Sequence, residues 1–125
     1  MSVRIVPKTP SAYAYPLLIK YLLQSNSDYA AGQEIVYGDR SRYDYQTLSR
    51  RVAKLANALG DLGVRQGDTV AVMDWDSHRY LECYFAVPML GAVLHTINIR
   101  LPRDQILYTV NHAEDDLLIV HTDFL

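Results

Sequence analysis

Residues 69–97 read TVAVMDWDSHRYLECYFAVPMLGAVLHTI, and this stretch decides the fold. Its two ends, Thr69–Met73 and Ala92–Ile97, are short apolar runs without polar alternation, which is typical of strands that are covered on both faces. Between them, Ser77–Leu90 has the length of a helix, with Gly91 after its end and Pro88 in its last turn. The pattern predicts a strand, a helix and a second strand that pairs in parallel with the first.

The same unit recurs toward the end of the chain. Pro102–His112 is expected to be a helix and Leu117–His121 a third apolar strand. Right-handed crossovers would then join three parallel strands into a βαβαβ unit. We therefore expect an α/β fold with three layers and a mostly parallel sheet. Because no further helix follows the third strand, we expect this unit to be part of a larger domain.

Simpler elements are expected before this unit. Residues 1–15 hold few apolar anchors and should form an extended arm, and Pro16 suits the first turn of a helix that runs to about Ser25. Two short strands, Glu34–Tyr37 and Arg42–Tyr43, flank the turn residues Gly38 and Asp39 and should pair as a hairpin. We divide the chain into this arm, residues 1–15, and a domain portion, residues 16–125.

A strongly amphipathic helix should follow the hairpin. One apolar stripe recurs at steps of three and four residues and comprises Leu48, Val52, Leu55, Leu59 and Leu62. Asp44 is expected to cap its N-terminus, with Tyr43 packing onto Leu48. Gly63 should end the helix in a left-handed conformation and let Val64 fold back.

Composition excludes several classes of protein. The 125 residues carry a net charge of −2, so no basic field favours nucleic acid. The single Cys83 forms no internal disulfide and fits a reducing compartment. The N-terminal residues lack the apolar run of a signal peptide, and the apolar stretch 84–94 is too short to span a bilayer. We expect a cytoplasmic protein without a transmembrane segment, and we leave open a peripheral association of the whole protein with a membrane.

The junction at Asp74-Trp75-Asp76-Ser77 is the first candidate for chemistry, because ligands bind beyond the carboxyl ends of parallel strands. Asp74 and Asp76 could hold a cation, but a capping role for Asp76 is the more common use of such a residue. Neither of the glycine-rich fingerprints that cradle phosphate occurs in the chain.

The four histidines and the cysteine are expected to be structural. His112 precedes an acidic triplet, Glu114-Asp115-Asp116, and we interpret this segment as a solvated turn. His78, His95 and His121 lack the spacing of a zinc site, and His95 should be a hydrogen-bonded histidine of the sheet. Cys83 is expected to pack in the core.

Tyrosine is unusually frequent, with ten residues against two phenylalanines and one tryptophan. Tyr13, Tyr15, Tyr21 and Tyr29 crowd the N-terminal region. Rings of this kind favour interfaces, so we expect contact with the remainder of a longer polypeptide or with a second subunit in a homodimer. A local core rich in tyrosine would explain them nearly as well.

Three segments together resemble the AMP-forming acyl-CoA synthetases. They are residues 45–59 with 62–72, residues 78–101, and the run from Gln105 to Asp115. The resemblance covers about residues 34–123, and LHTINIRL, residues 94–101, looks more like the branch for medium- and long-chain fatty acids than other branches. Relatives often have Asn where this chain has Asp76, and both residues cap helices well.

The resemblance implies a ligase that joins a carboxylate to ATP and then transfers the acyl group to coenzyme A, with Mg²⁺ as a cofactor. The family's phosphate loop, its acidic magnesium ligand and its catalytic lysine have no counterpart here. Lys8, Lys20 and Lys54 do not lie in the family's catalytic setting. We therefore assign no catalytic, cofactor-binding or metal residue, expect no tight cofactor binding by these residues alone, and expect the chain to be an inactive N-terminal part of the large domain.

One further prediction and two alternative functions remain at this point. The loop Asn98-Ile99-Arg100 could face the rest of an enzyme, with Arg100 either paired across an internal interface or solvated. The chain could instead be a free-standing α/β binding or dimerisation module, with Asp74 and Asp76 as a small cation pocket. An aryl-CoA ligase or another adenylate-forming ligase differs only in substrate.

Overall fold

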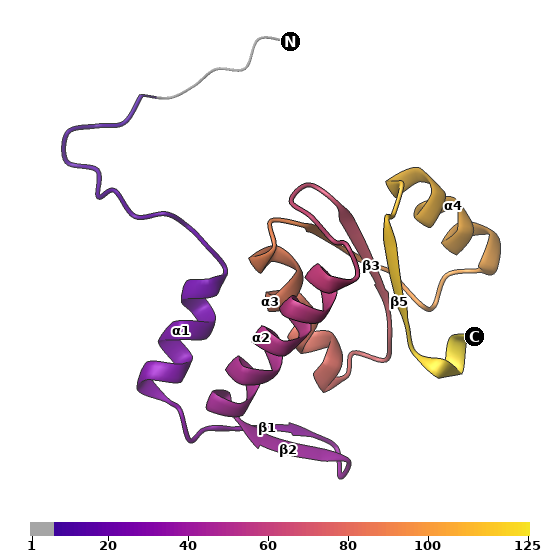
Figure 1. Ribbon diagram of the computed structural model, residues 1–125, viewed down its shortest axis with the longest axis horizontal. Coiled ribbons are helices and arrows are strands. Elements are labelled where there is room, and N and C mark those ends of the chain that lie inside the picture. Colours follow the sequence, from indigo (N-terminus) through magenta and orange to yellow (C-terminus); the bar gives the residue numbers. More distant parts are fainter. Residues whose placement is uncertain (1–6) are drawn as a thin grey trace.

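The computed structural model describes residues 7–125 and has the expected α/β architecture (Figure 1). Its helices are α1 (Lys20–Tyr29), α2 (Tyr45–Asp61), α3 (His78–Met89) and α4 (Arg103–Ala113). Its strands are β1 (Glu34–Tyr37), β2 (Ser41–Asp44), β3 (Thr69–Met73), β4 (Val93–Thr96) and β5 (Leu117–Val120). A short 3₁₀ helix, η1 (Thr122–Phe124), follows β5.

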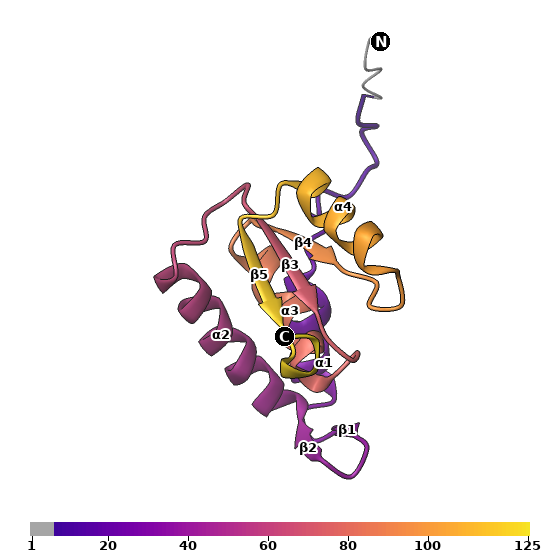
Figure 2. The same cartoon turned by 90° about the vertical axis from the view of Figure 1, so that its right-hand side faces the viewer.

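The main sheet has the strand order β4-β3-β5, and both pairs are parallel. Helices α2 and α3 lie on one side of this sheet and α4 lies on the other, so three layers are formed (Figures 1 and 2). The predicted βαβαβ unit is therefore confirmed. The hairpin is confirmed as well, since β1 and β2 pair antiparallel around Gly38, whose φ is 55°.

Apolar side chains from α2, α3 and one face of the sheet form the core. Val70 and Val72 of β3 pack with Leu59 of α2 and Val87 of α3, and all four are almost fully buried. A second cluster joins Leu48 and Val52 of α2 to Ala86 of α3 and Leu23 of α1. Burial of these aliphatic groups is the main force that holds the helices to the sheet.

Helix α2 follows the sequence closely. The carboxylate of Asp44 accepts a hydrogen bond from the Thr47 backbone N–H at 2.7 Å, which caps the helix and lowers the pKa of Asp44. Gly63 has a φ of 103°, and the N–H of Val64 donates to the carbonyl of Leu59. Leu62 differs from the prediction: it lies at the C-cap, beyond the last turn that faces the core, and is 71% exposed.

The start of α1 corrects a predicted boundary. The helix begins at Lys20 rather than near Pro16 and runs past Ser25 to Tyr29. Leu17 is 96% exposed, whereas Leu23 is buried among Leu48, Val52 and Ala86. A short helix depends on tertiary packing, so it forms where a side chain can reach the core. Residues 7–15 contain neither helix nor strand, as predicted for the arm, and the rest of the predicted arm lies outside the described residues.

Candidate functional site

The carboxyl ends of β3 and β4 form the candidate site, and the loop after β3 is built around a buried carboxylate. Asp74 is 9% exposed, and its side chain accepts hydrogen bonds from the Trp75 backbone N–H at 2.7 Å and from the Ser77 hydroxyl. Ser77 in turn accepts from the backbone N–H groups of Arg79 and Tyr80 and so caps α3. Both oxygens of Asp74 are therefore engaged in holding this turn together.

The predicted capping role of Asp76 is wrong. The N-cap is Ser77, one residue later, and Asp76 has a φ of 48° and an exposed side chain. The turn needs one residue in the left-handed region so that the chain can leave β3 and enter α3. Aspartate tolerates that region better than most residues other than glycine.

A shallow depression of about 210 Å³ lies between the loops after β3 and β4. It is lined by Asp74, Asp76, Tyr80, Tyr84, Thr96, Ile97, Asn98, Ile99 and Arg100. The amide oxygen of Asn98 accepts a hydrogen bond from the Arg100 backbone N–H at 3.0 Å. The Arg100 side chain is exposed, and no carboxylate among the described residues forms an ion pair with it, so it is solvated within this chain.

The described side chains do not fit a metal ion at this edge. Among residues 7–125, no group of three or more His, Cys, Asp or Glu side chains is arranged to hold one. The Asp74 carboxylate is already satisfied by protein donors. The pair Asp74 and Asp76 thus serves the turn in this structure.

His95 is a hydrogen-bonded histidine of the sheet, as predicted. Its Nδ1 lies 2.8 Å from a carboxylate oxygen of Asp115, whose side chain is only 1% exposed. Asp116 accepts a hydrogen bond from the Thr69 backbone N–H at 2.8 Å. The prediction of a merely solvated acidic turn is therefore wrong for these two acids, because they tie the segment before β5 to β4 and β3.

An ionic cluster around the buried Glu82, between α2 and α3, was missed at the level of sequence. Glu82 is 5% exposed; it accepts a hydrogen bond from Arg51 Nε at 2.6 Å and one from the Tyr43 hydroxyl at 3.2 Å. Burial, followed by the charge of Glu82, raises the pKa of Tyr43 to about 12. The one available indication was an acid inside the apolar run of α3.

The remaining candidates, His78 and Cys83, have structural roles. His78 contacts the rings of Tyr37 and Tyr43, and its Nδ1 is buried without a hydrogen-bond partner among the described residues. Cys83 is buried in the core, as predicted, and burial raises the pKa of its thiol to about 11. A thiol with so high a pKa is a poor nucleophile at neutral pH.

Aromatic side chains join the ends of β3 and β5. The indole N–H of Trp75 donates to Asp123 at 2.8 Å, and its ring lies 4.8 Å from that of Phe124. His121 Nδ1 accepts from the Asp123 backbone N–H at 3.2 Å and so caps the short helix η1. The chain after β5 is thereby held against the end of β3.

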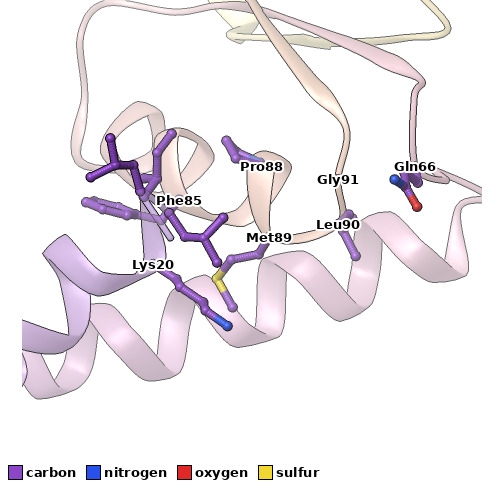
Figure 3. Close-up of a pocket in the computed structure, with 10 residues that line it drawn as sticks. Lys20, Gln66, Phe85, Pro88, Met89, Leu90 and Gly91 are labelled. Atoms are coloured by element: carbon purple, nitrogen blue, oxygen red, sulfur yellow. The ribbon is translucent and has the colours of Figure 1, made fainter. Parts of the chain in front are cut away.

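An apolar groove lies on another side of the molecule, between the start of α1 and the end of α3 (Figure 3). It encloses about 700 Å³ and is lined by Leu17, Leu18, Ile19, Lys20, Gln66, Phe85, Pro88, Met89, Leu90 and Gly91. Gly91 has a φ of 74°, and an added Cβ would lie 2.9 Å from Gln66 Cγ, so glycine is required there. The groove holds no cluster of titratable groups.

In the described part of the chain, no helix is long and apolar enough to cross a membrane.

Comparison with known proteins defines the class. The fold is a parallel α/β unit, and the sequence profile of the family described as AMP-binding enzyme matches residues 23–124. The chain therefore belongs to the AMP-binding enzyme family, as its resemblance to the acyl-CoA synthetases predicted.

Two curated relatives narrow the comparison. The chain is 38% identical to a medium-chain-fatty-acid–CoA ligase of Ectopseudomonas oleovorans, over 87% of this chain and 21% of that protein. It is 44% identical to a long-chain-fatty-acid–CoA ligase of Thermus thermophilus, over 70% of this chain and 16% of that protein. The chain thus spans about a fifth or less of the length of these relatives.

Solved structures support the same fold. A crystal structure of the anthranilate CoA ligase AuaEII with anthranoyl-AMP matches with a TM-score of 0.80 and 27% identity, over 88% of this chain and 22% of that one. A protein from Rhodopseudomonas palustris, described provisionally as a long-chain-fatty-acid CoA ligase, also matches. Its TM-score is 0.79 at 24% identity, over 86% of this chain and 28% of that one. At that identity, the second match concerns the fold alone.

Proposed function

We propose that the whole protein is an AMP-forming ligase that converts fatty acids to acyl-CoA thioesters, and that residues 16–125 are the N-terminal part of its large domain. The observation that carries this proposal is the family match over residues 23–124, together with the names of the two curated relatives given above. ATP, Mg²⁺ and coenzyme A are the cofactors of that reaction, and a cytoplasmic location belongs to the same proposal.

The role proposed for this chain is architectural. The Asp74 carboxylate at the sheet edge accepts hydrogen bonds from backbone and hydroxyl donors, and the buried carboxylates of Glu82 and Asp115 face Arg51 and His95. Groups used in this way are not free to bind magnesium or to act as a base. These residues would supply one wall of the large domain, and the phosphate loop, the magnesium ligand and the lysine would come from elsewhere in the polypeptide.

The experiment begins with the reading frame beyond codon 125. The complete product should catalyse fatty-acid-dependent ATP–pyrophosphate exchange, and residues 1–125 alone should catalyse none. Exchange by residues 1–125 alone would refute the architectural role. A reading frame that stops at codon 125 would rule out catalysis by the family mechanism and favour a binding or assembly module.

The identity of the carboxylic acid substrate is tested in the same assay. We expect octanoate or palmitate to support faster exchange than anthranilate, because the relatives with 38% and 44% identity are named for fatty acids. The anthranilate ligase is 27% identical to the chain. Faster exchange with anthranilate than with either fatty acid would replace the fatty acid by an aryl substrate and leave the ligase class intact.

The N-terminal region is proposed to contact a second subunit in a homodimer. Apolar side chains are unusually exposed there, and they include Tyr13, Tyr15, Leu17, Leu22 and Tyr29. Tyr15 lies between Tyr13 and Tyr21, with ring centroids 6.1 Å and 5.0 Å away. Such a row of exposed rings, apolar on their faces and polar at the hydroxyls, suits a protein interface.

A further inference from the structure

The apolar groove between the start of α1 and the end of α3 has a lining that is uniform in chemistry except at its ends. Its walls are aliphatic and aromatic side chains from both segments, and they include Leu18, Ile19, Phe85, Pro88 and Met89 (Figure 3). Among the described residues that line the groove, Lys20 is the one charged residue and Gln66 the one other polar side chain. This composition favours a molecule that is apolar along most of its length and polar at one end.

The groove lies apart from the candidate site at the carboxyl ends of the strands. Gln66 precedes β3 and Gly91 precedes β4, and the N–H of Gly67 donates to the carbonyl of Gly91 at 3.0 Å. The groove is therefore near the amino ends of these strands, whereas Asp74, Asn98 and the depression between them follow the carboxyl ends. A ligand in the groove would occupy a second, separate site.

Exposed apolar surface and shape both suit a small ligand. Leu18, Ile19 and Met89 are each close to half exposed around the groove, and such apolar patches mark binding sites. Its volume of about 700 Å³ is within the range of small-molecule sites, about 300–1,000 Å³. Met89 is unbranched and can adapt to a flexible chain. Leu17 is 96% exposed and belongs to the proposed subunit contact, so the ligand would lie against the other side chains.

The charge at the groove favours an anion. The Lys20 side chain is exposed, and its Nζ lies 5.4 Å from the centroid of the Tyr21 ring. The ion pairs of the described residues do not include Lys20. No aspartate or glutamate lines the groove, and the first turn of α1 contains no acid. A carboxylate beside Lys20 would thus meet an ammonium group that has no competing acidic partner there.

We propose that this groove binds the anion of a straight-chain carboxylic acid, with its alkyl chain against Phe85 and Met89 and its carboxylate paired with Lys20. Burial of the alkyl chain against apolar walls supplies the favourable free energy, and the ion pair selects the acid over an uncharged chain. The inference goes beyond the proposed function, because it assigns a second binding site and depends on no reaction.

Cysteine protection in the complete gene product tests the site. Met89→Cys should react with a maleimide at least about threefold more slowly when laurate is added below its micelle-forming concentration, because the alkyl chain covers position 89. Val36→Cys is the matched control, since Val36 is 49% exposed and Met89 is 48% exposed, but Val36 lies in the hairpin. Laurate should leave the labelling of Val36→Cys unchanged.

The chain and the carboxylate are then varied separately. Protection should strengthen from hexanoate to laurate, by at most about fourfold for each added methylene. Dodecanol has the same chain length without the charge and should bind roughly two- to fivefold more weakly than laurate. Lys20→Met, introduced beside Met89→Cys, should remove that difference. Lys54→Met removes an exposed lysine of α2 instead and should preserve it.

Four results would overturn the proposal. They are no protection by laurate, equal protection of Val36→Cys, equal binding of laurate and dodecanol with Lys20 present, and protection by anionic phospholipid vesicles alone, which would assign the patch to a membrane surface. Met89→Cys that is unreactive before any ligand is added would assign the groove to another part of the polypeptide or to a second copy, and would also overturn it.

A measurement on the unsubstituted product covers the case in which Met89→Cys does not fold. A laurate analogue that carries a diazirine on its chain should cross-link on illumination to peptides that contain residues 17–20 or 85–91. Cross-links confined to other segments would overturn the proposal. Neither experiment requires the product to be active in ATP–pyrophosphate exchange, so the ligase function and the groove stand or fall separately.

Discussion

Glu82 shows how much one residue can depend on its tertiary surroundings. It lies in an apolar helix segment and becomes a buried carboxylate that is paired with Arg51 and Tyr43. Burying a charge costs free energy unless it is paired and hydrogen-bonded, so the three residues stabilise one another as a unit. The cluster also joins α2, α3 and the hairpin.

We predict that Glu82→Gln lowers the free energy of unfolding by about 2 kcal/mol, because it leaves Arg51 and Tyr43 without their charged partner. Urea unfolding measures the change. The control is Glu34→Gln, which removes an exposed ion pair with Arg42 and should cost under about 0.5 kcal/mol. Equal losses in the two variants would contradict the assigned role of Glu82.

His78 should make stability depend on pH. Burial, the largest effect, and the nearby Arg79 lower its pKa below the ordinary value of 6.5; Arg51 acts in the same direction, and Glu82 and Asp74 act against it. The folded chain then binds this proton less readily than the unfolded chain. The part of the free energy of unfolding that depends on neutral His78 is therefore fully present above pH 6.5. It is lost as the pH falls below that value.

The measurement is urea unfolding at about pH 8 and about pH 5. His78→Phe keeps a ring between Tyr37 and Tyr43 and removes the titrating group. We expect a smaller loss of stability between the two pH values in His78→Phe than in the unsubstituted chain. An unchanged loss would show that His78 is not the responsible group.

At the scale of elements, the turn from β3 to α3 distributes its tasks among four consecutive residues. Asp74 anchors the turn, Trp75 contacts the residues after β5, Asp76 supplies the left-handed conformation and Ser77 caps the helix. Aspartate and serine are both good N-caps, which is why local sequence favoured Asp76 where the structure uses Ser77.

The turn therefore predicts opposite outcomes for neighbouring substitutions. Ser77→Ala should lower the free energy of unfolding by about 1–2 kcal/mol, because the cap is lost and Asp74 loses a donor. Asp76→Gly should leave stability unchanged or raise it slightly, since glycine adopts positive φ without strain. Thermal unfolding of the two variants checks the difference, and a larger loss for Asp76→Gly would return the capping role to Asp76.

At the scale of the whole molecule, exposed apolar groups gather in two places. One is residues 13–29, which hold Leu17 and four tyrosines, and the other is the sheet face that bears Leu118. Large exposed apolar patches mark interaction sites in folded proteins. The first is proposed to meet a second subunit.

Replacing both Tyr15 and Leu17 by serine should convert a dimer of the protein to a monomer, because both side chains lie in the proposed contact. Sedimentation equilibrium gives the mass. Leu62→Ser is the matched control, since Leu62 is also well exposed but lies at the end of α2. A dimer that persists in the double variant, or a monomeric unsubstituted protein, would rule out contact through the N-terminal region.

The sequence by itself determined the elements and the family. The stripe of α2 and its caps at Asp44 and Gly63 are set by neighbours three or four residues away, so they can be read from local spacing. The apolar runs of β3, β4 and β5 likewise predict parallel strands. The resemblance to acyl-CoA synthetases depends on residue identities alone, and the family match confirms it.

Only the tertiary structure decided which polar groups pair with one another and where a short helix such as α1 begins. Asp115 meets His95 across twenty positions, and Glu82 meets Arg51 across thirty-one, distances at which sequence spacing carries no information about contact. The start of α1 was settled by where Leu23 reaches the core. Pairing of this kind arises because folding brings distant segments together and buried charge must then find a partner in space.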